Sequence, residues 1–335
     1  RSSWVTGVQT CALPISKTLQ EHRCDYLAVA VADEGEALRK EGISIPIIVM
    51  DPEFSSFNVL FERQLEPEVY SFRLLDALMK EAGRRGITSY PIHIKIDTGM
   101  HRLGFRPSDV REICQRLEQQ SSLVVRSVFS HLVGSDSPEH DEFTRGQIRL
   151  FTQSAEALEA GLGYPVLKHI LNSAGIERFT GHQMDMVRLG ISLYGISASV
   201  SEAKKLQPVS SLKTTILQIR DVPAGDSIGY SRKTYAQRDL RVAILPIGYA
   251  DGLDRHLSNG VGEVVINGTR CPIVGNICMD ICMVDVTDAD AQEGDTAIIF
   301  GFQLPVTEIA DKLDTIPYEI LTSISPRVKR IYYRE

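Results

Sequence analysis

The chain has 335 residues, of which 43% are hydrophobic and 24% charged, a balance typical of a soluble globular protein with a sizeable core. The net charge of −7 gives no reason to expect a nucleic-acid partner, and no apolar run approaches the roughly 20 residues that a membrane helix needs. Six scattered cysteines are too few for a disulfide scaffold, so the sequence predicts a protein of the reducing cytoplasm.

The first sixteen residues, RSSWVTGVQTCALPIS, differ from the rest of the chain. They contain the only Trp, lack an initiating Met, and show neither helical nor strand periodicity. Polar residues interrupt them too often for the apolar core of a secretory signal. We therefore predict that residues 1–16 are a non-native leader joined to a gene fragment, and that the native pattern begins at Lys17.

From Lys17 onward, short β-rich runs alternate with amphipathic helices, which indicates parallel βα units. The strands are expected within residues 26–32, 45–51, 68–72, 92–97, 123–132, 166–173 and 184–191, and the main helices within 34–42, 73–86, 107–119 and 143–161. Seven such units in about 180 residues predict an α/β fold, a (β/α)8 TIM-like barrel lacking its first βα unit, over residues 17–205. A doubly wound sheet is the alternative, although the chain has no G-x-G-x-x-G fingerprint and no P-loop.

After Ser197 the pattern changes. The segment EAKKLQPVSS at 202–211 is a plausible linker, and residues 206–335 are rich in short strands and turns, which predicts a mostly β C-terminal domain. The turns PAGD at 223–226 and ING at 266–268 are of the hairpin type. A short helix is expected near Thr307 to Leu313, with a last strand at 330–335.

Ligands of a barrel bind at the carboxyl ends of its strands, so the polar residues at those ends are the candidates for function. They are Asp97 to Arg102, His131, Asn172 with Ser173, and Arg188 to Ile191. Backbone N–H groups around Gly190 and the Ser173 hydroxyl would suit a phosphate. Each candidate also has a structural alternative: Ser173 could cap a helix, and His131 and His169 could be hydrogen-bonded core histidines.

Six stretches, taken together and in this order, resemble alanine racemase. They are HIKIDTGMHRLGF (93–105), VFSHL (128–132), KHILNSAG (168–175), MDMVRLGISLYG (184–195), LPIGYADG (245–252) and VGNICMD (274–280). The resemblance implies a two-domain enzyme that interconverts L-alanine and D-alanine with pyridoxal 5'-phosphate and supplies D-alanine for peptidoglycan.

The resemblance also assigns the cofactor-binding residues. Arg188 would donate a hydrogen bond to the pyridine nitrogen of the cofactor. Because an arginine is a very poor proton donor, the ring nitrogen would stay unprotonated, and the Cα carbanion would be reprotonated rather than transaminated. The other implied cofactor-binding residues are His169, Asn172, Ser173, Gly190 and Ile191.

Racemisation needs two bases on opposite faces of the substrate Cα. The resemblance implies that Tyr249 is one base, supported by a hydrogen-bonded chain through His131, and that a lysine bound to the cofactor as a Schiff base is the other. Arg102 would hold the substrate carboxylate, and Lys95, often carbamylated in the family, would orient it. Met279 and Asp280 would line the substrate side. In the family, the tyrosine and the Met-Asp pair reach the site of the other subunit, which implies a homodimer with shared active sites.

The sequence departs from the family in two places. The Schiff-base lysine of the family lies in a motif like KANAYGHG, which is absent here, and Lys17 opens a helix instead of ending a strand. Pro326 stands where several members carry a tyrosine. The alternatives are a racemase of another small amino acid such as serine, a non-catalytic pyridoxal-phosphate-binding protein, or an inactive fragment. The GYADG and ICMD motifs argue against the second of these. No metal is expected, because no second Cys or His pair accompanies Cys278 and Cys282.

Overall fold

The computed structural model describes residues 12–197 and 206–333, which form two compact units. Unit 1 extends to Leu193, and unit 2 begins at Gln207 and also includes Tyr194–Ile196. The predicted leader residues 1–11 and the first part of the predicted linker, residues 202–205, lie outside the described residues.

Unit 1 is built on a parallel sheet of six described strands whose spatial order, β1-β2-β3-β4-β5-β6, is their order in the sequence. A doubly wound sheet reverses its strand order at a switch point, whereas a barrel adds each strand beside the previous one. The barrel-type architecture is therefore confirmed over the doubly wound alternative. The strands are β1 (Leu27–Val29), β2 (Ile47–Val49), β3 (Glu66–Val69), β4 (Tyr90–Lys95), β5 (Leu123–Phe129) and β6 (Leu167–His169).

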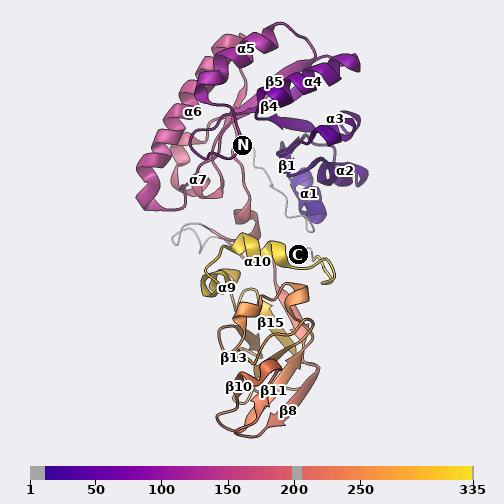
Figure 1. Ribbon diagram of the computed structural model, residues 1–335, viewed down its shortest axis with the longest axis vertical. Helices are drawn as coiled ribbons and strands as arrows, with labels where there is room; N and C mark the ends of the chain where they lie inside the picture. Colours follow the sequence, from indigo (N-terminus) through magenta and orange to yellow (C-terminus); the bar gives the residue numbers. More distant parts are fainter. Residues whose placement is uncertain (1–11, 198–205, 334–335) are drawn as a thin grey trace. The chain divides into compact units, whose positions relative to one another are not determined.

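Amphipathic helices cover the outer face of this sheet. In Figure 1, the helices α4, α5 and α6 form an arc outside β4 and β5. Alternate residues of β4, Ile92 and Ile94, pack in one core cluster with leucines of α4. His93 and Lys95 must therefore point to the inner face, which is polar. The helices of unit 1 are α1 (Ala12–Glu21), α2 (Ala32–Lys40), α3 (Phe57–Glu62), α4 (Phe72–Arg84), α5 (Val110–Glu118), α6 (Asp141–Leu162) and α7 (Ser173–Arg178).

Unit 1 differs from the sequence predictions at three places, one of which is α7, a helix that no pattern predicted. Helix α1 begins at Ala12, five residues before Lys17, and Ile15 and Leu19 of this helix pack against the apolar cluster around β1 and β2. The strand predicted at 184–191 does not form. Met184 has a positive φ of 50°, and only two backbone bonds, from Asp185 and Arg188, link the segment to residues 168–171.

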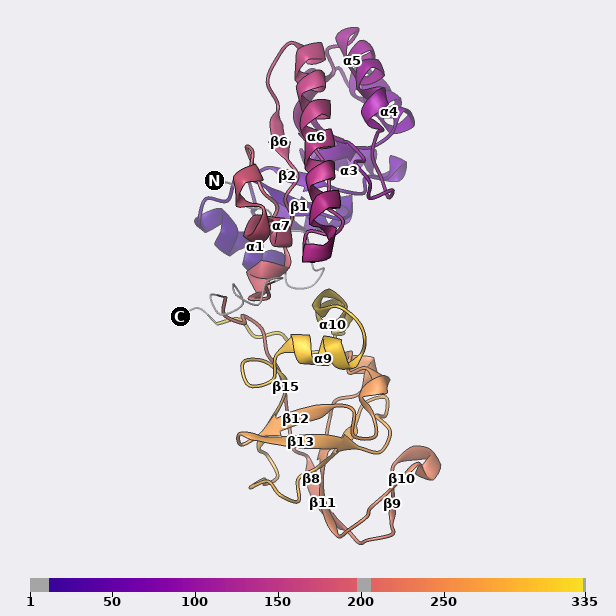
Figure 2. The ribbon, with the colours of Figure 1, turned by 90° about the vertical axis from the view of Figure 1, so that its left-hand side faces the viewer.

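Unit 2 contains an antiparallel sheet in the order β7-β15-β12-β13-β14-β11-β8, together with the pair β9–β10. In Figure 2, α9 and α10 lie at one end of this unit and the β9–β10 pair toward the other. The elements are β7 (Leu212–Thr215), β8 (Gln218–Val222), β9 (Ser227–Ile228), β10 (Thr234–Tyr235), β11 (Leu240–Leu245), β12 (Glu263–Ile266), β13 (Thr269–Val274), β14 (Cys282–Asp285), β15 (Thr296–Phe300), α9 (Val306–Lys312) and α10 (Pro317–Ser323).

The turns of unit 2 were partly predicted. Asn267 and Gly268 both have positive φ angles and join the paired strands β12 and β13, as the ING signal indicated. Residues 223–226 form a turn, but β9, which follows it, pairs with β10 instead of β8. The last strand is absent from residues 330–333, and α10 was not predicted.

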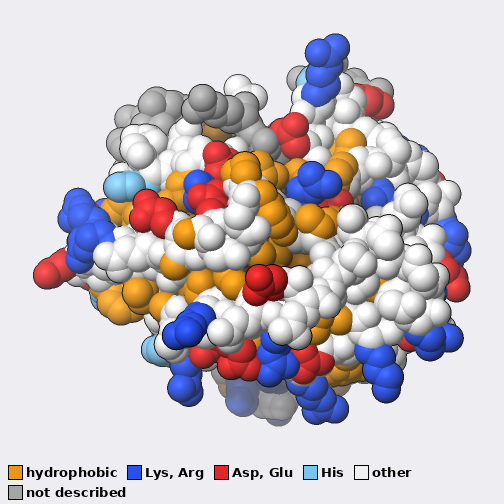
Figure 3. All heavy atoms as spheres, turned by 90° about the horizontal axis from the view of Figure 1, so that it is seen from above, with side chains coloured by type: hydrophobic (Ala, Val, Ile, Leu, Met, Phe, Trp, Pro, Cys, Tyr) orange, Lys and Arg blue, Asp and Glu red, His pale blue; other side chains and the backbone are white. Residues whose placement is uncertain are grey.

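None of the described helices combines the length and the apolar character needed to cross a bilayer. On the face shown in Figure 3, side chains of both charge signs share the margin and hydrophobic side chains gather toward the middle.

Candidate active site

The functional candidates of unit 1 gather where three neighbouring strands end. Lys95, the last residue of β4, is in register with Phe129 at the end of β5, and Phe129 is in register with His169 at the end of β6. The ring of Phe129 stacks on that of His169 at a centroid distance of 4.8 Å. Because parallel strands end at one edge of the sheet, the residues that follow them also lie close together.

Arg188 is the buried centre of this edge, with 4% of its surface exposed. Its Nη1 lies 2.8 Å from Nδ1 of His169. Its Nη2 donates to the carbonyl oxygens of Ser130 and Ile170 at 2.6 and 3.0 Å and lies 3.3 Å from Nδ1 of His131. Burial lowers the pKa of Arg188 to about 10, so the guanidinium remains charged at neutral pH. The structure thus brings His131 and His169, from two separate motifs, together around the fixed cation of Arg188, which comes from a third.

Both histidines beside Arg188 are neutral and have a defined proton position. An arginine only donates hydrogen bonds, so Nδ1 of His131 and Nδ1 of His169 must accept, and each ring carries its proton on Nε2. Burial, with the positive charges of Arg188, Arg102 and Lys95, lowers the pKa of His131 to about 3. Burial and the Arg188 charge also lower the pKa of His169 well below its usual value. His131 therefore offers a neutral ring whose Nε2–H can donate.

The loop after β6 holds the residues predicted to bind phosphate. Asn172 is the N-cap of α7, because its Oδ1 accepts from the N–H of Gly175 at 2.9 Å. Ser173 is the first helical residue, and its hydroxyl accepts from the N–H of Gly190 at 2.9 Å. The capping alternative for Ser173 is therefore wrong. Ser173 and Gly190 lie beside the turn that begins at Ile191.

Arg102 lies in the loop after β4 and is exposed. It forms no hydrogen bond or ion pair with any residue in the described part of the chain. An exposed guanidinium of this kind suits an anionic ligand. The resemblance implies that Lys95 orients Arg102, whereas in the structure Lys95 lies against Glu68.

The ion pair of Lys95 with Glu68 was missed by sequence reasoning. Lys95 Nζ lies 3.0 Å from Oε1 of Glu68 in β3, and the two side chains are 5% and 0% exposed. Apart from this ammonium group, neither oxygen of Glu68 has a hydrogen-bond donor among the described residues. Burial raises the pKa of Glu68 to about 7 despite the attraction of Lys95. A carbamate on Lys95 would place a second anion beside this carboxylate, so an ionised Glu68 opposes the implied carbamylation.

Unit 2 carries the other candidates on two neighbouring loops. Tyr249 begins the turn Tyr249–Asp251 after β11, and its side chain is 45% exposed. Its backbone N–H donates to the carbonyl of Cys278 at 3.1 Å, and the N–H of Ala250 donates to that of Met279 at 3.0 Å. These bonds connect the turn Tyr249–Asp251 to the loop that contains Met279 and Asp280, here called the Met-Asp loop, so the two motifs meet at one surface of unit 2.

Arg327 joins the same two loops and was not singled out from the sequence. Its Nε donates to Asp251 and its Nη2 to Asp280, each at 2.7 Å. The two carboxylates raise the pKa of Arg327 above its usual value. The Asp280 carboxylate is thus paired within unit 2. Arg327 directly follows Pro326, where the sequence departs from the alanine racemase pattern, and this position is the signal that could have found it.

The two loops of unit 2 leave no room for a side chain at Gly248. A Cβ there would lie 2.3 Å from the carbonyl oxygens of both Cys278 and Met279. We expect Gly248→Ala to separate the loops and to lower the free energy of unfolding by about 2 kcal/mol, measured by denaturant titration. In the matched control Gly83→Ala in α4, the new Cβ meets nothing within 4 Å. That helix substitution should stabilise by about 0.5–1 kcal/mol. Equal stabilities for the two variants would contradict the loop contact.

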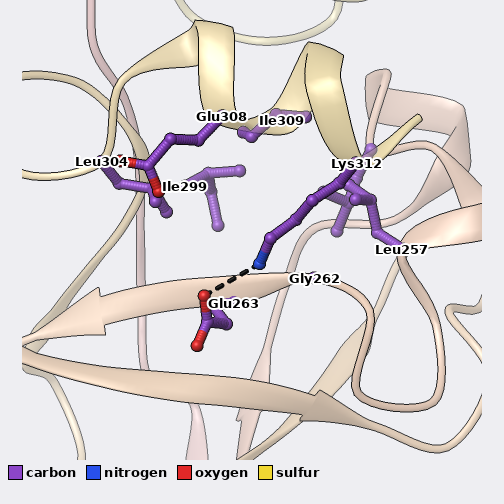
Figure 4. A pocket seen from close by; sticks show the side chains of 9 residues that line it. Leu257, Gly262, Glu263, Ile299, Leu304, Glu308, Ile309 and Lys312 are labelled. Atoms are coloured by element: carbon purple, nitrogen blue, oxygen red, sulfur yellow. Dashed lines mark hydrogen bonds and ion pairs between the residues drawn. The ribbon is translucent and has the colours of Figure 1, made fainter. Parts of the chain in front are cut away.

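A separate cavity in unit 2 offers no comparable chemistry. It lies between α9 and β12, and its lining includes the apolar side chains of Leu257, Ile299 and Leu304 (Figure 4). Lys312 crosses it to pair with Glu263 at 2.8 Å. Among the described residues, no group of three or more His, Cys, Asp or Glu is arranged to hold a metal.

Comparison with known proteins places both units in one family. Residues 7–198 match the model of the alanine racemase N-terminal domain, and residues 209–332 match that of the C-terminal domain. The chain belongs to the alanine racemase family. This assignment confirms the predicted class, a pyridoxal-phosphate-dependent racemase family.

Individual members of the family match over nearly the whole chain. "Alanine racemase 2" of Caldanaerobacter subterraneus subsp. tengcongensis is 39% identical over 332 residues, covering 96% of this chain and 84% of the relative. An alanine racemase structure from Clostridium difficile has a TM-score of 0.92 at 32% identity and covers 99% of this chain and 89% of that one. The structure from Bartonella henselae, with covalently bound pyridoxal phosphate, has a TM-score of 0.87 at 28% identity, covering 99% and 93%.

Proposed function

We propose that this chain is a pyridoxal-phosphate-dependent alanine racemase that interconverts L-alanine and D-alanine. The observation that carries the proposal is the charged, buried guanidinium of Arg188, held by two histidines and two backbone carbonyls at the strand ends. Relatives named alanine racemase favour alanine over serine as the substrate. The proposal includes a cytoplasmic homodimer with shared active sites that supplies D-alanine for peptidoglycan.

The residues at the strand ends suit pyridoxal phosphate. The Ser173 hydroxyl accepts from the N–H of Gly190 and keeps its own proton for a phosphate oxygen, and the turn that begins at Ile191 lies beside this pair. Asn172 is the cap that holds the loop. The guanidinium of Arg188 suits its pyridine nitrogen, because it donates a hydrogen bond without giving up its proton. When bound, pyridoxal phosphate withdraws electrons from the alanine Cα and makes its proton acidic. Arg188 would keep that withdrawal moderate, so the proton returns to Cα.

Inversion at Cα needs a base on each face, and we propose Tyr249 for one face. Its phenol is half exposed, and its backbone is fixed to the Met-Asp loop. A free tyrosine has a pKa of about 10, so it needs a neighbouring donor to act as a base. The Nε2–H of His131 is the donor that we propose. Lys95 does not suit the opposite face, because its ammonium is held by Glu68.

The remaining roles concern substrate binding and the second base. We propose that the exposed guanidinium of Arg102 holds the substrate carboxylate, and that Met279 and Asp280 line the substrate side. The family resemblance implies that the second base is a lysine in a KANAYGHG-like motif, and residues 1–335 contain no such motif. Sequencing the locus upstream of the Lys17 codon tests this point and the proposal that residues 1–16 are a non-native leader.

The proposed activity is tested with the chain completed by a KANAYGHG-like lysine segment before Lys17, which is incubated with L-alanine and pyridoxal phosphate while D-alanine is measured by chiral chromatography. The 335-residue chain, which lacks the second base, is run beside it and is expected to form no D-alanine. L-Serine is run in parallel, and the reactions without pyridoxal phosphate are the control. We expect D-alanine to form faster than D-serine and only with the cofactor. Cofactor binding, followed by absorbance, without any D-alanine would favour the non-catalytic alternative. Faster D-serine formation would favour a serine racemase.

In the chain completed with the KANAYGHG-like lysine segment, Tyr249→Ala is expected to slow proton abstraction from one enantiomer of alanine far more than from the other. Each base serves one face of Cα, and loss of a general base costs about 100-fold or more. Based on the family assignment, the L-enantiomer should be the one affected. The measurement is exchange of the Cα proton with D2O, followed separately from L- and D-alanine by NMR. Tyr249→Phe, which keeps the ring and loses only the hydroxyl, should show the same asymmetry. Equal losses from both enantiomers would contradict the two-base assignment.

A further inference from the structure

A continuous row of hydrogen-bonding side chains crosses the inner face of unit 1 and ends at Arg188. Glu66 Oε2 lies 2.8 Å from Nε2 of His93, and Nδ1 of His93 lies 2.7 Å from the Ser127 hydroxyl. The same hydroxyl lies 3.0 Å from Nε2 of His169, whose Nδ1 lies 2.8 Å from Nη1 of Arg188. Four contacts therefore connect a carboxylate on β3 to the guanidinium at the strand ends.

The strand register explains why these residues meet. His93 of β4 is in register with Ser127 of β5, and Ser127 is in register with Leu167 of β6, two residues before His169. Residues two apart in a strand face the same side, so His169 and Ser127 both point to the inner face. His93, Ser127 and His169 are 0%, 0% and 1% exposed. No water is needed to complete the row, because each contact is within hydrogen-bond distance.

The chemistry of the two ends gives every bond in the row one direction. Arg188 can only donate, so Nδ1 of His169 accepts and its Nε2 carries the proton. That Nε2–H donates to the Ser127 hydroxyl, which in turn donates to Nδ1 of His93. The Nε2–H of His93 then donates to the Glu66 carboxylate, which can only accept. A donor-only group and an acceptor-only group therefore fix both histidine tautomers and the hydroxyl rotamer between them.

The surroundings keep both histidines neutral. Burial lowers the pKa of His93, against the opposing effect of Glu66. Burial and Arg188 lower the pKa of His169 well below its usual value. The rings of Tyr26 and His93 form a T-shaped pair at a centroid distance of 6.1 Å, and the positive charge of Arg126 also disfavours the protonated form of His93. A row in which every hydrogen bond points in the same direction requires neutral rings, because a doubly protonated histidine has no acceptor nitrogen.

We propose that Glu66, His93 and Ser127 are positioning residues that act through His169 to fix and polarise Arg188. A hydrogen-bonded row in a buried site is polarised cooperatively, so the Glu66 charge makes Nδ1 of His169 a stronger acceptor for the guanidinium. Arg188 is thereby held from the inside of the sheet, while Ser130 and Ile170 hold it through their carbonyls. The effect on the cofactor rests on the proposed function, but the row itself does not.

The test measures histidine tautomers directly in the cofactor-free, 15N-labelled chain by long-range 1H–15N correlation NMR. His93→Gln and His169→Gln variants assign the two rings. Both rings are expected as the neutral Nε2–H form, with no titration between about pH 6 and pH 9. An Nδ1–H form of either ring, or a protonated ring in that range, would overturn the proposal. This result is independent of racemase activity, so its failure is distinguishable from failure of the proposed function.

Variants at Ser127 test whether the row acts at a distance. Ser127 does not touch Arg188, yet Ser127→Ala is expected to shift the Arg188 Nε–H resonance, and Ser127→Thr, which keeps the hydroxyl, is expected to restore it. Glu66→Gln should keep both tautomers, because its amide oxygen still accepts, and should shift the Arg188 resonance in the same direction. A purely structural role for Ser127 would alter the unfolding midpoint without moving that resonance, which would overturn the proposal. In the chain completed with the KANAYGHG-like lysine segment, and with cofactor and alanine, Ser127→Ala should lower kcat about fivefold, the effect of one hydrogen bond.

Discussion

In the chain completed with a KANAYGHG-like lysine segment, Arg188→Glu is expected to lower the racemisation rate about 100-fold or more, a typical cost of losing a preorganised charge in an active site. The substitution puts an acid where the proposed cofactor contact requires a donor that keeps its proton. A carboxyl group would stabilise the protonated pyridine, so electron withdrawal from Cα would deepen and transamination would rise. The measurement is the ratio of D-alanine to pyruvate formed from L-alanine. An unchanged ratio would count against the contact between Arg188 and the pyridine nitrogen.

The control for this prediction must separate chemistry from folding. The guanidinium also donates to the carbonyls of Ser130 and Ile170, so any replacement removes buried hydrogen bonds. Arg188→Lys keeps the positive charge and loses the fork of donors. It should be destabilised as Arg188→Glu is, yet it should not produce additional pyruvate. Near-UV circular dichroism at the assay temperature shows whether each variant keeps its tertiary packing.

Lys95→Met is expected to destabilise the protein by about 3–5 kcal/mol at pH 8, the usual cost of leaving a buried charge unpaired. Lys95 is the cation that lies 3.0 Å from Glu68. Burial raises the pKa of Glu68 to about 7, so the contribution of this carboxyl to stability is present at low pH and declines as pH rises through that value. Without Lys95 the pKa of Glu68 should rise further, so the decline should extend to higher pH and the loss of stability between pH 5 and pH 8 should be larger. Denaturant titrations of both proteins at pH 5 and pH 8 measure it.

The matched double variant Lys95→Met with Glu68→Gln tests the cause of that loss. A glutamine cannot ionise, so the double variant should recover most of the stability that Lys95→Met loses at pH 8. It should also remove the difference between pH 5 and pH 8 that this pair produces. If the double variant is as unstable as the single one at pH 8, the loss comes from packing of the Lys95 stem and not from an unpaired carboxylate.

The sequence predicted the parts of the fold that depend on local pattern. Apolar runs marked the strands around Ile47 and Ile92, and helical spacing marked α4 and α6. The strand prediction for 184–191 was wrong because the apolar residues of this segment have the pattern of a strand, whereas its backbone has the path that carries Arg188 to the strand ends. The side chain of Arg188 takes carbonyls at the strand ends, a tertiary interaction that no local pattern records.

The residues of the candidate site that stand in a recognisable motif were predicted from the sequence. The residues that matter only because strand register places them beside a distant partner were missed. Arg188, His169 and Tyr249 stand in recognisable stretches. Glu68 and Ser127, in contrast, look like ordinary polar residues in strands, and their importance comes from neighbours 27 and 42 positions away. Arg327 is similar, because the aspartates that it joins are 76 and 47 positions distant. Such pairings depend on which strands and loops become neighbours in the fold, and a single sequence does not show these neighbours.

The strand orders of the two sheets have a consequence for the order of folding during synthesis. In unit 1 each strand pairs with the one made just before it, so the sheet can grow as the ribosome releases the chain. In unit 2 the first strand, β7, pairs with the last, β15, through the register Leu212↔Phe300. Strand β7 cannot join that sheet until Phe300 has emerged from the ribosome. This late, long-range pairing makes the sheet of unit 2 the slower one to form.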